Sequence, residues 1–175
     1  MRRVWAGTLI LVAGGISLFG QTSTVSITGV TNSASGASAI ESGSWVSIYG
    51  TGLATTTRAW QASDFTGTAL PTTIDNVSVL IDGKNAAIAY VSPGQLNVQA
   101  PADTATGAVP VVVKNLNGTG TSTVTLQNYA PAFFTLQAKY VAALHNSDGT
   151  VVAPAGFLGS AVSSRPAQPG ESLQI

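Results

Sequence analysis

The stretch Ser42-Gly-Ser-Trp-Val-Ser-Ile-Tyr-Gly-Thr-Gly-Leu53 decides the fold. From Trp45 to Tyr49 its side chains alternate, so that the aliphatic Val46 and Ile48 fall on one face of an extended backbone. Two glycines then close the stretch, which is typical of a strand that runs into a turn. The pattern predicts a β-strand with one face in a hydrophobic core.

Five more segments of four to seven residues have a similar apolar pattern and follow at spacings of roughly ten residues. They are residues 76–81, 86–91, 95–99, 108–114 and 122–127. Turn residues separate them, among them Asp82-Gly83, a strong hairpin signal that predicts 86–91 as the return strand of 76–81. Pro110 lacks an N–H and must sit at an edge or at a position that donates nothing. Six such strands predict an all-β Greek-key sandwich of the immunoglobulin-like type.

The long polar connection 54–72 shows no helical period and is either a binding loop or a crossover between two sheets. Its residues Arg58, Trp60 and Phe65 are our candidate ligand-binding residues, because exposed aromatic rings suit stacking on sugars or on a partner surface. The alternative is that Trp60 caps one end of the sandwich. We expect Trp45 to be a core or inter-module residue.

The domain boundaries follow from composition. Residues 21–39 are rich in Ser, Thr, Gly and Ala and are expected to be a linker and lead-in, with one short β-like run at Thr24–Ile27 and a loop at 29–36. Residues 40–132 are the predicted sandwich. Phe133 and Phe134 then look like a hydrophobic seal towards a further module, and 133–175 is expected to hold a linker hairpin and the truncated start of that module.

The evidence for a second module is a weak internal repeat. When Gln168–Ile175 is set beneath Glu41–Ile48, Gly170 falls under Gly43 at a spacing of 127 residues, and two apolar positions also match. Without a partner sheet, such a strand start should be poorly anchored or should pair opportunistically.

The composition excludes several classes of function. Charged residues make up 8% of the chain, about a third of the roughly 25% typical of soluble domains. Seven basic and seven acidic residues cancel, so nothing attracts a phosphate backbone and we expect no nucleic-acid partner. The chain has no cysteine, which rules out disulfides, thiolate metal sites and a cysteine nucleophile.

The first twenty residues have the pattern of a secretory signal peptide. Arg2 and Arg3 form a basic start, 4–19 is largely apolar, and Gly20 precedes a polar run. An uncleaved membrane anchor is the alternative, although an apolar run of about sixteen residues is just short of a membrane span. After cleavage near Gly20, five basic and seven acidic residues would remain, a net charge of −2. The protein is therefore expected to be secreted, extracellular or at the cell surface after periplasmic transit.

An ordered series of motifs carries a family resemblance. These are Gly43–Leu53, Leu70-Pro71, Val77-Ser-Val79, Asp82-Gly-Lys84, Tyr90-Val-Ser-Pro93, Gln95–Pro101 and Tyr129-Ala-Pro-Ala-Phe133. Over about residues 28–175 the chain resembles the uncharacterised C-terminal domain family of secreted acidobacterial proteins, itself similar to the IPT/TIG branch of immunoglobulin-like folds. The resemblance implies an extracellular β-sandwich, often in tandem, and supplies no catalytic residues. The chain departs from it because the domain directly follows the signal peptide and the second copy is cut short.

Nothing in the sequence predicts catalysis, a metal site or a cofactor. His145 is the sole histidine, so neither a metal cluster nor a catalytic triad has the partners it needs, and we expect it at the end of a hairpin. The carboxylates fall mostly in turns, and no pair stands out as a glycosidase pair.

We therefore expect a non-catalytic extracellular module for adhesion, surface attachment or structural spacing. The alternative is a glycan-binding accessory module of a secreted carbohydrate-active protein. The expected partners are a polysaccharide or another surface protein, with self-association through sheet edges as a further hypothesis. A membrane is expected as a partner only if the signal segment stays uncleaved.

Overall fold

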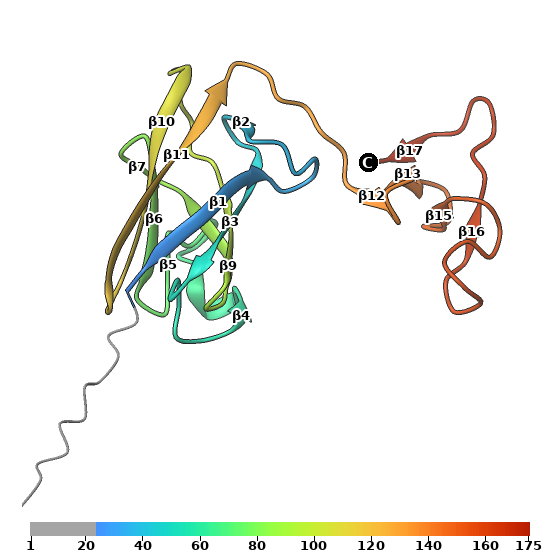
Figure 1. Cartoon of the computed structure of the whole chain (residues 1–175). Coiled ribbons are helices and arrows are strands. Elements are labelled where there is room, and N and C mark those ends of the chain that lie inside the picture. Colours follow the sequence, from blue (N-terminus) through green and yellow to red (C-terminus); the bar gives the residue numbers. More distant parts are fainter. Residues whose placement is uncertain (1–23) are drawn as a thin grey trace, which may run out of the picture.

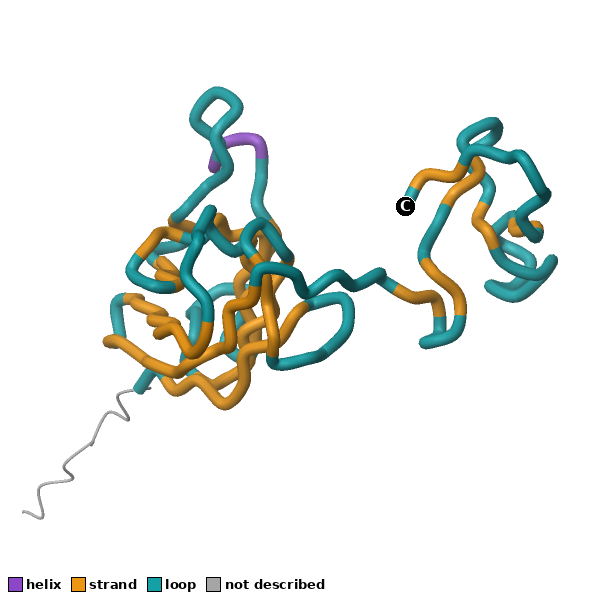
Figure 2. Tube along the Cα trace, turned by 90° about the horizontal axis from the view of Figure 1, so that it is seen from above, coloured by secondary structure: helices purple, strands orange, loops and turns teal. Residues whose placement is uncertain are grey.

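The computed structural model describes residues 24–175, which form a β-sandwich followed by a small group of short strands (Figure 1). The predicted signal peptide at 1–20 lies outside the described residues. In Figure 2 the sandwich and the C-terminal strands are separate groups joined by a loop segment. We call residues 135–175 the C-terminal segment.

The first layer of the sandwich, sheet A, has five strands in the order β1-β3-β9-β8-β4. Their bounds are β1 (Ser26–Asn32), β3 (Trp45–Thr51), β9 (Gln95–Gln99), β8 (Ala87–Val91) and β4 (Arg58–Ala59). All neighbouring pairs in this sheet are antiparallel.

The second layer, sheet B, has the order β2-β11-β10-β6-β5, with β7 also paired to β6. The bounds are β2 (Ala39–Glu41), β11 (Gly118–Gln127), β10 (Gly107–Asn115), β6 (Val77–Ile81), β5 (Thr73–Ile74) and β7 (Lys84–Asn85). The chain crosses from sheet A to sheet B through residues 60–72, which contain the short 3-10 helix η1 (Ala62–Asp64).

One continuous hydrophobic core of 22 buried residues fills the space between the sheets. The inward residues alternate along each strand, as Val46 and Ile48 do in β3 and Leu96 and Val98 do in β9. Burying such a side chain stabilises the fold by about 1.5–3 kcal/mol. This core confirms the predicted all-β sandwich.

The structure confirms the six predicted strands but changes the partner of one. Asp82 and Gly83 form a tight turn with positive φ at both positions, as a type I′ hairpin requires. The return strand, however, is the two-residue β7, and the chain then leaves for sheet A as β8. The prediction that 86–91 returns against 76–81 is therefore wrong. Residues 87–91 pair with β9 in sheet A, so that their apolar side chains pack on sheet B across the core.

Pro110 lies within the central strand β10, paired opposite Thr123 of β11. Its carbonyl accepts a hydrogen bond from the backbone N–H of Asp82, so its missing N–H faces the turn after β6 rather than the ladder. The predicted non-donating position is confirmed.

The prediction that 21–39 is a linker, with a loop at 29–36, is wrong for the first half of that loop. Residues Ser26–Asn32 form β1, which pairs with β3 along its whole length. The register shifts between Ile27 and Gly29, so the period of two breaks in the middle of the strand. The sandwich therefore begins with β1 and not at residue 40.

The chain enters and leaves the sandwich at opposite ends. Near the start of β1, Val25 lies so close to Gly120 that a Cβ there would fall 2.8 Å from its Cγ1. At the other end, the side-chain amide of Asn32 donates to the carbonyl of Ala130 over 3.3 Å. β1 and β11 therefore run in the same direction, and β11 ends at the top of the sandwich in Figure 1 while β1 starts at the bottom.

The C-terminal segment forms two small sheets. β12 (Thr135–Leu136) pairs with β13 (Tyr140–Val141), and the other sheet has the order β16-β15-β14-β17. Its strands are β14 (Leu144–His145), β15 (Val151–Val152), β16 (Ser164–Arg165) and β17 (Leu173–Gln174). The predicted strand start at the chain end thus pairs with β14. That it begins a second sandwich stays a prediction.

Phe133 and Phe134 do not form the predicted hydrophobic seal. They are 56% and 52% exposed, because the C-terminal segment does not cover them. Exposed aromatic rings at this position are available to a ligand or partner.

Candidate functional site

The connection between β3 and β5 is a crossover with a fixed conformation. Within it, Arg58 holds two carboxylates together: Nη1 lies 2.7 Å from Asp64 Oδ2, and Nη2 lies 2.8 Å from Asp75 Oδ1. The guanidinium also donates through Nε to Asp75 and through Nη2 to Asp64. We call these three residues the Arg58 clamp.

The clamp shifts the titration of its members. Hydrogen bonds from Arg58 and then from Thr56 lower the pKa of Asp75 to about 2. Hydrogen bonds from Arg58 and from the Gln61 backbone also lower the pKa of Asp64. Both carboxylates therefore stay ionised and bound to Arg58 at neutral pH. The guanidinium of Arg58 is thus bound by two carboxylates, and that Arg58 contacts a ligand stays a prediction.

The clamp positions Trp60 on the outer face of sheet A. The Trp60 backbone N–H donates to the carbonyl of Ala89, and the residue is partly buried against the hydrophobic cluster. The centroid of Trp60 is 5.3 Å from that of Phe65 and 5.9 Å from that of Trp45. These separations are those of favourable tilted and edge-to-face aromatic pairs. Phe65 supports Trp60 and does not line the groove described next.

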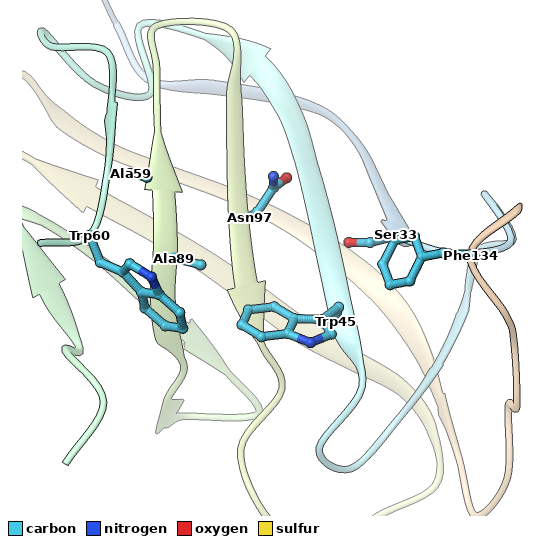
Figure 3. Close-up of a pocket in the computed structure, with 7 residues that line it drawn as sticks. All are labelled: Ser33, Trp45, Ala59, Trp60, Ala89, Asn97 and Phe134. Atoms are coloured by element: carbon cyan, nitrogen blue, oxygen red, sulfur yellow. The ribbon is translucent and has the colours of Figure 1, made fainter. Parts of the chain in front are cut away.

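An open groove of about 380 Å³ lies over this face of sheet A, and we call it the aromatic groove. It is lined by Ser33, Trp45, Ala59, Trp60, Ala89, Asn97 and Phe134. Figure 3 shows the three aromatic side chains in a row, with Ala89 and Asn97 between them on the sheet. The alanines leave the space because they have no side chain beyond Cβ. The volume falls at the lower end of the range of small-molecule sites.

Asn97 is the polar group at the centre of the groove. Its Oδ1 accepts hydrogen bonds from Ser47 Oγ at 3.2 Å and from Gln95 Nε2 at 2.8 Å. Ser47 Oγ in turn lies 2.8 Å from Ser33 Oγ. These bonds fix the orientation of the Asn97 amide and leave its Nδ2 without a protein partner among residues 24–175.

A second polar cluster lies in the C-terminal segment. Arg165 bridges two carboxylates, with Nη1 2.6 Å from Glu171 Oε1 and Nη2 3.2 Å from Asp148 Oδ2. The buried His145 joins them: its Nε2 lies 3.0 Å from the Arg165 carbonyl, and its Nδ1 lies 3.1 Å from Glu171 Oε2 without hydrogen-bond alignment. We call these four residues the tail clasp.

The tail clasp ties strands together and contains no activated nucleophile. His145 stands in β14, at the end of the hairpin with β15 as expected, and is 1% exposed. Its ring contacts the backbone of Arg165 and the side chain of Glu171, so no substrate reaches it. Across residues 24–175 no three histidine, cysteine or carboxylate side chains come together as a metal site.

Sequence reasoning found Trp60 but missed the other groove residues. Trp45 was expected in the core or between modules, yet it lines the groove from β3. The sequence did indicate that Asn97 faces outward. Leu96 and Val98 face the core, and neighbouring side chains of a strand point to opposite faces. The contribution of Phe134 had no signal, because it depends on where the chain leaves the sandwich.

The comparisons with known proteins agree with the fold. A family model of the IPT/TIG domain matches residues 26–128, more than half of the chain. The chain belongs to the IPT/TIG domain family. The match starts at β1, in agreement with the corrected start of the sandwich. Comparison with curated proteins gives no match.

Similar solved structures include an auxiliary nutrient binding protein from Bacteroides ovatus, at 17% identity over 60% of this chain and with a TM-score of 0.38. One of the same description from Bacteroides thetaiotaomicron is 14% identical over 56% of this chain, with a TM-score of 0.36. The matches cover 21% and 19% of those chains, so this protein spans about a fifth of their length. Identity and overlap are both low, and nothing about function follows from them.

No helix in residues 24–175 has the length and apolar character needed to cross a membrane.

Proposed function

We propose that the protein is a non-catalytic, exported module that spaces neighbouring parts of a secreted chain. The observation that carries this proposal is the position of the chain ends: the sandwich begins beside Gly120 and ends beside Asn32, at opposite ends of β1. With about 3.3 Å per strand residue, the ten residues from Gly120 to Ala130 separate the two ends by roughly 30 Å. A module with this arrangement extends a chain by its full length.

The exit from the sandwich is also fixed in direction. The backbone N–H of Ala130 donates to Glu41 Oε2 over 2.8 Å, and the Asn32 amide holds the carbonyl of the same residue. Because both polar groups of one residue are bound to the sandwich, the chain leaves along a defined path. A defined exit suits spacing better than a free linker does.

The polar clusters favour the same function. The Arg58 clamp and the tail clasp bring ionised groups together, but in each of them both carboxylates are bound to one arginine, and these ion pairs hold segments of the backbone together. Catalysis needs side chains in a pocket whose pKa or nucleophilicity is suited to reaction with a bound substrate. Surface attachment or adhesion would require a ligand or partner in addition to the spacing geometry. Glycan binding would depend on the aromatic groove and not on the positions of the chain ends.

The spacing geometry is tested by a distance measurement in the chain that starts at Gln21. The sequence has no cysteine, so Thr24→Cys and Pro131→Cys, both exposed positions, introduce two labelling sites. Pulsed electron paramagnetic resonance between spin labels there should give one narrow distribution centred at roughly 30–40 Å. A broad distribution, or one centred below 20 Å, would contradict the proposal.

A further inference from the structure

The aromatic groove offers a ligand no charged side chain in its lining, which consists of seven neutral residues. The guanidinium of Arg58, the residue before the lining residue Ala59, is bound by Asp64 and Asp75 and also donates to the Ala59 carbonyl, so it is not a free cation. A charged ligand would therefore lose its hydration in the groove without gaining an ion pair. A neutral ligand does not pay this cost.

The ring arrangement favours a flat ligand with apolar faces and polar edges. Trp60, Trp45 and Phe134 come from three different parts of the chain and lie in a row along the sheet (Figure 3). Between Trp60 and Trp45, Asn97 lines the groove, and its Nδ2 has no protein partner among residues 24–175. The hydroxyl of Ser33 lies beside Phe134. A pyranose ring has this chemistry: its C–H face packs on an aromatic ring, while its hydroxyls accept and donate hydrogen bonds.

A peptide fits the groove less well. The floor is the face of sheet A, where β3, β9 and β8 already pair their backbone groups with one another. A peptide bound by strand addition needs an unpaired strand edge, and a face supplies none. A nucleic acid needs cations for its phosphates, and the groove has none.

We propose that the aromatic groove binds a neutral polysaccharide made of pyranose sugars, with one ring stacked on Trp60 or Trp45 and a hydroxyl accepting from Asn97 Nδ2. Phe134 closes the groove at the side where the chain leaves the sandwich. This site does not depend on the spacing function, and either can fail while the other stands.

The chain carries its own reporter for this site. It has three tryptophans: Trp5 lies in the predicted signal peptide, and the other two both line the groove. In the chain that starts at Gln21, tryptophan fluorescence therefore comes from the groove alone. The probes are cellohexaose, xylohexaose and maltohexaose as neutral ligands, with hexagalacturonate as the charged counterpart.

At least one neutral hexasaccharide should change the fluorescence saturably, and hexagalacturonate should not. Isothermal titration calorimetry then compares variants that keep the fold, as checked by circular dichroism. Trp60→Ala should weaken binding about tenfold or more, as truncation of a central aromatic anchor does. Asn97→Asp keeps the oxygen that Ser47 and Gln95 bind but removes the free donor, so it should weaken binding severalfold.

The matched control is Tyr49→Ala, which removes a 42% exposed aromatic ring. Tyr49 lies in β3 on the same face as Trp45, but it does not line the groove. This variant should leave affinity unchanged. The proposal is overturned if no neutral hexasaccharide binds at 10 mM, if hexagalacturonate binds as tightly as the neutral sugars, or if Tyr49→Ala weakens binding as much as Trp60→Ala. Size-exclusion chromatography showing a dimer that Trp60→Ala dissociates would also overturn it, because a second copy would then occupy the groove.

Discussion

The sandwich and the C-terminal segment are both built from short strands, but they are held together by different forces. The sandwich encloses 22 buried hydrophobic residues in one cluster. In the C-terminal segment the buried apolar residues are Ala143 and Ala153, and the third buried residue is His145. Its strands, each two residues long, are tied instead by the tail clasp.

This difference teaches which part of the chain folds on its own. Apolar burial is additive over a large core and gives most of the stability of a domain. Ion pairs between partly exposed groups contribute little each, because water screens them. The sandwich should therefore be an independent folding unit, and the C-terminal segment should open at much lower cost.

The largest effect should come from a hole in the sandwich core. Leu96→Ala at a fully buried position should destabilise the fold by about 2–5 kcal/mol, because it removes apolar contacts and leaves a cavity. The same change at Leu116, which is 77% exposed, should cost less than about 0.5 kcal/mol. Urea unfolding followed by tryptophan fluorescence measures both. Equal losses would mean that the core does not hold the sandwich.

A smaller but still large effect should come from a close backbone approach in sheet A. A Cβ at Gly50 would overlap the Ser26 carbonyl oxygen, so Gly50→Ala must push β1 away from β3. We expect a loss of about 1–3 kcal/mol, the usual cost of overpacking. Gly94→Ala is the control, because there a Cβ meets nothing closer than 3.8 Å. If both variants unfold at the same urea concentration, β1 is not packed as described.

Acid should separate the two regions. Hydrogen bonds from Thr150, and then from Arg165, lower the pKa of Asp148 to about 2. A hydrogen bond from the Gln168 backbone, and then one from Arg165, lower the pKa of Glu171. A carboxylate whose pKa is lowered by folding stabilises the fold above its unfolded pKa and loses that contribution as pH falls towards the folded value. The tail clasp should therefore weaken between about pH 4 and pH 2.

Over the same interval the sandwich should stay folded, because its apolar core does not titrate. Hydrogen bonds from Arg58 and then from Thr56 also lower the pKa of Asp75 in the clamp to about 2. Protonation of Asp75 weakens these hydrogen bonds but leaves the apolar core intact. Nuclear magnetic resonance of the Val151 and Val152 methyls reports on the segment, and tryptophan fluorescence reports on the sandwich. The double variant Asp148→Asn, Glu171→Gln should loosen the segment already at neutral pH. Loss of both signals in one transition would contradict this separation.

The smallest effect should be at the junction between the regions. Glu41→Ala removes the acceptor of the Ala130 N–H and should widen the distance distribution between spin labels at residues 24 and 131, with little change in its centre. Glu41→Gln keeps an oxygen at this position and should keep the distribution narrow. An unchanged width in Glu41→Ala would show that other contacts fix the exit.

The sequence predicted the parts of the fold that obey a local period. Val46, Leu96 and Val98 alternate cleanly with polar residues, and their strands were found. Only the start of β1 was predicted, as the β-like run Thr24–Ile27, because the bulge after Ile27 breaks the alternation and a glycine follows. The partner of β8 was missed because a turn signal such as Asp82-Gly83 fixes the turn but not how long the returning strand lasts.

The candidate site was predicted only in part because it is assembled from distant residues. Trp60 stood out as an aromatic residue in a polar connection, whereas Asn97 and Phe134 belong to a strand and to the exit from the sandwich. The pairing of Arg58 with Asp64 and Asp75 was not predicted, because the sequence does not show that the two carboxylates would surround it. Contacts across such separations depend on the sheet order, which local patterns do not contain.

Spacing requires a sandwich that stays folded whatever the C-terminal segment does. Hydrogen exchange measured by mass spectrometry on the chain from Gln21 at neutral pH tests this most directly. Amides of β3, β9 and β10 should exchange only through global unfolding, roughly a hundredfold or more slowly than those of β12 to β17. Exchange of both regions in one cooperative step, at one rate, would contradict the account.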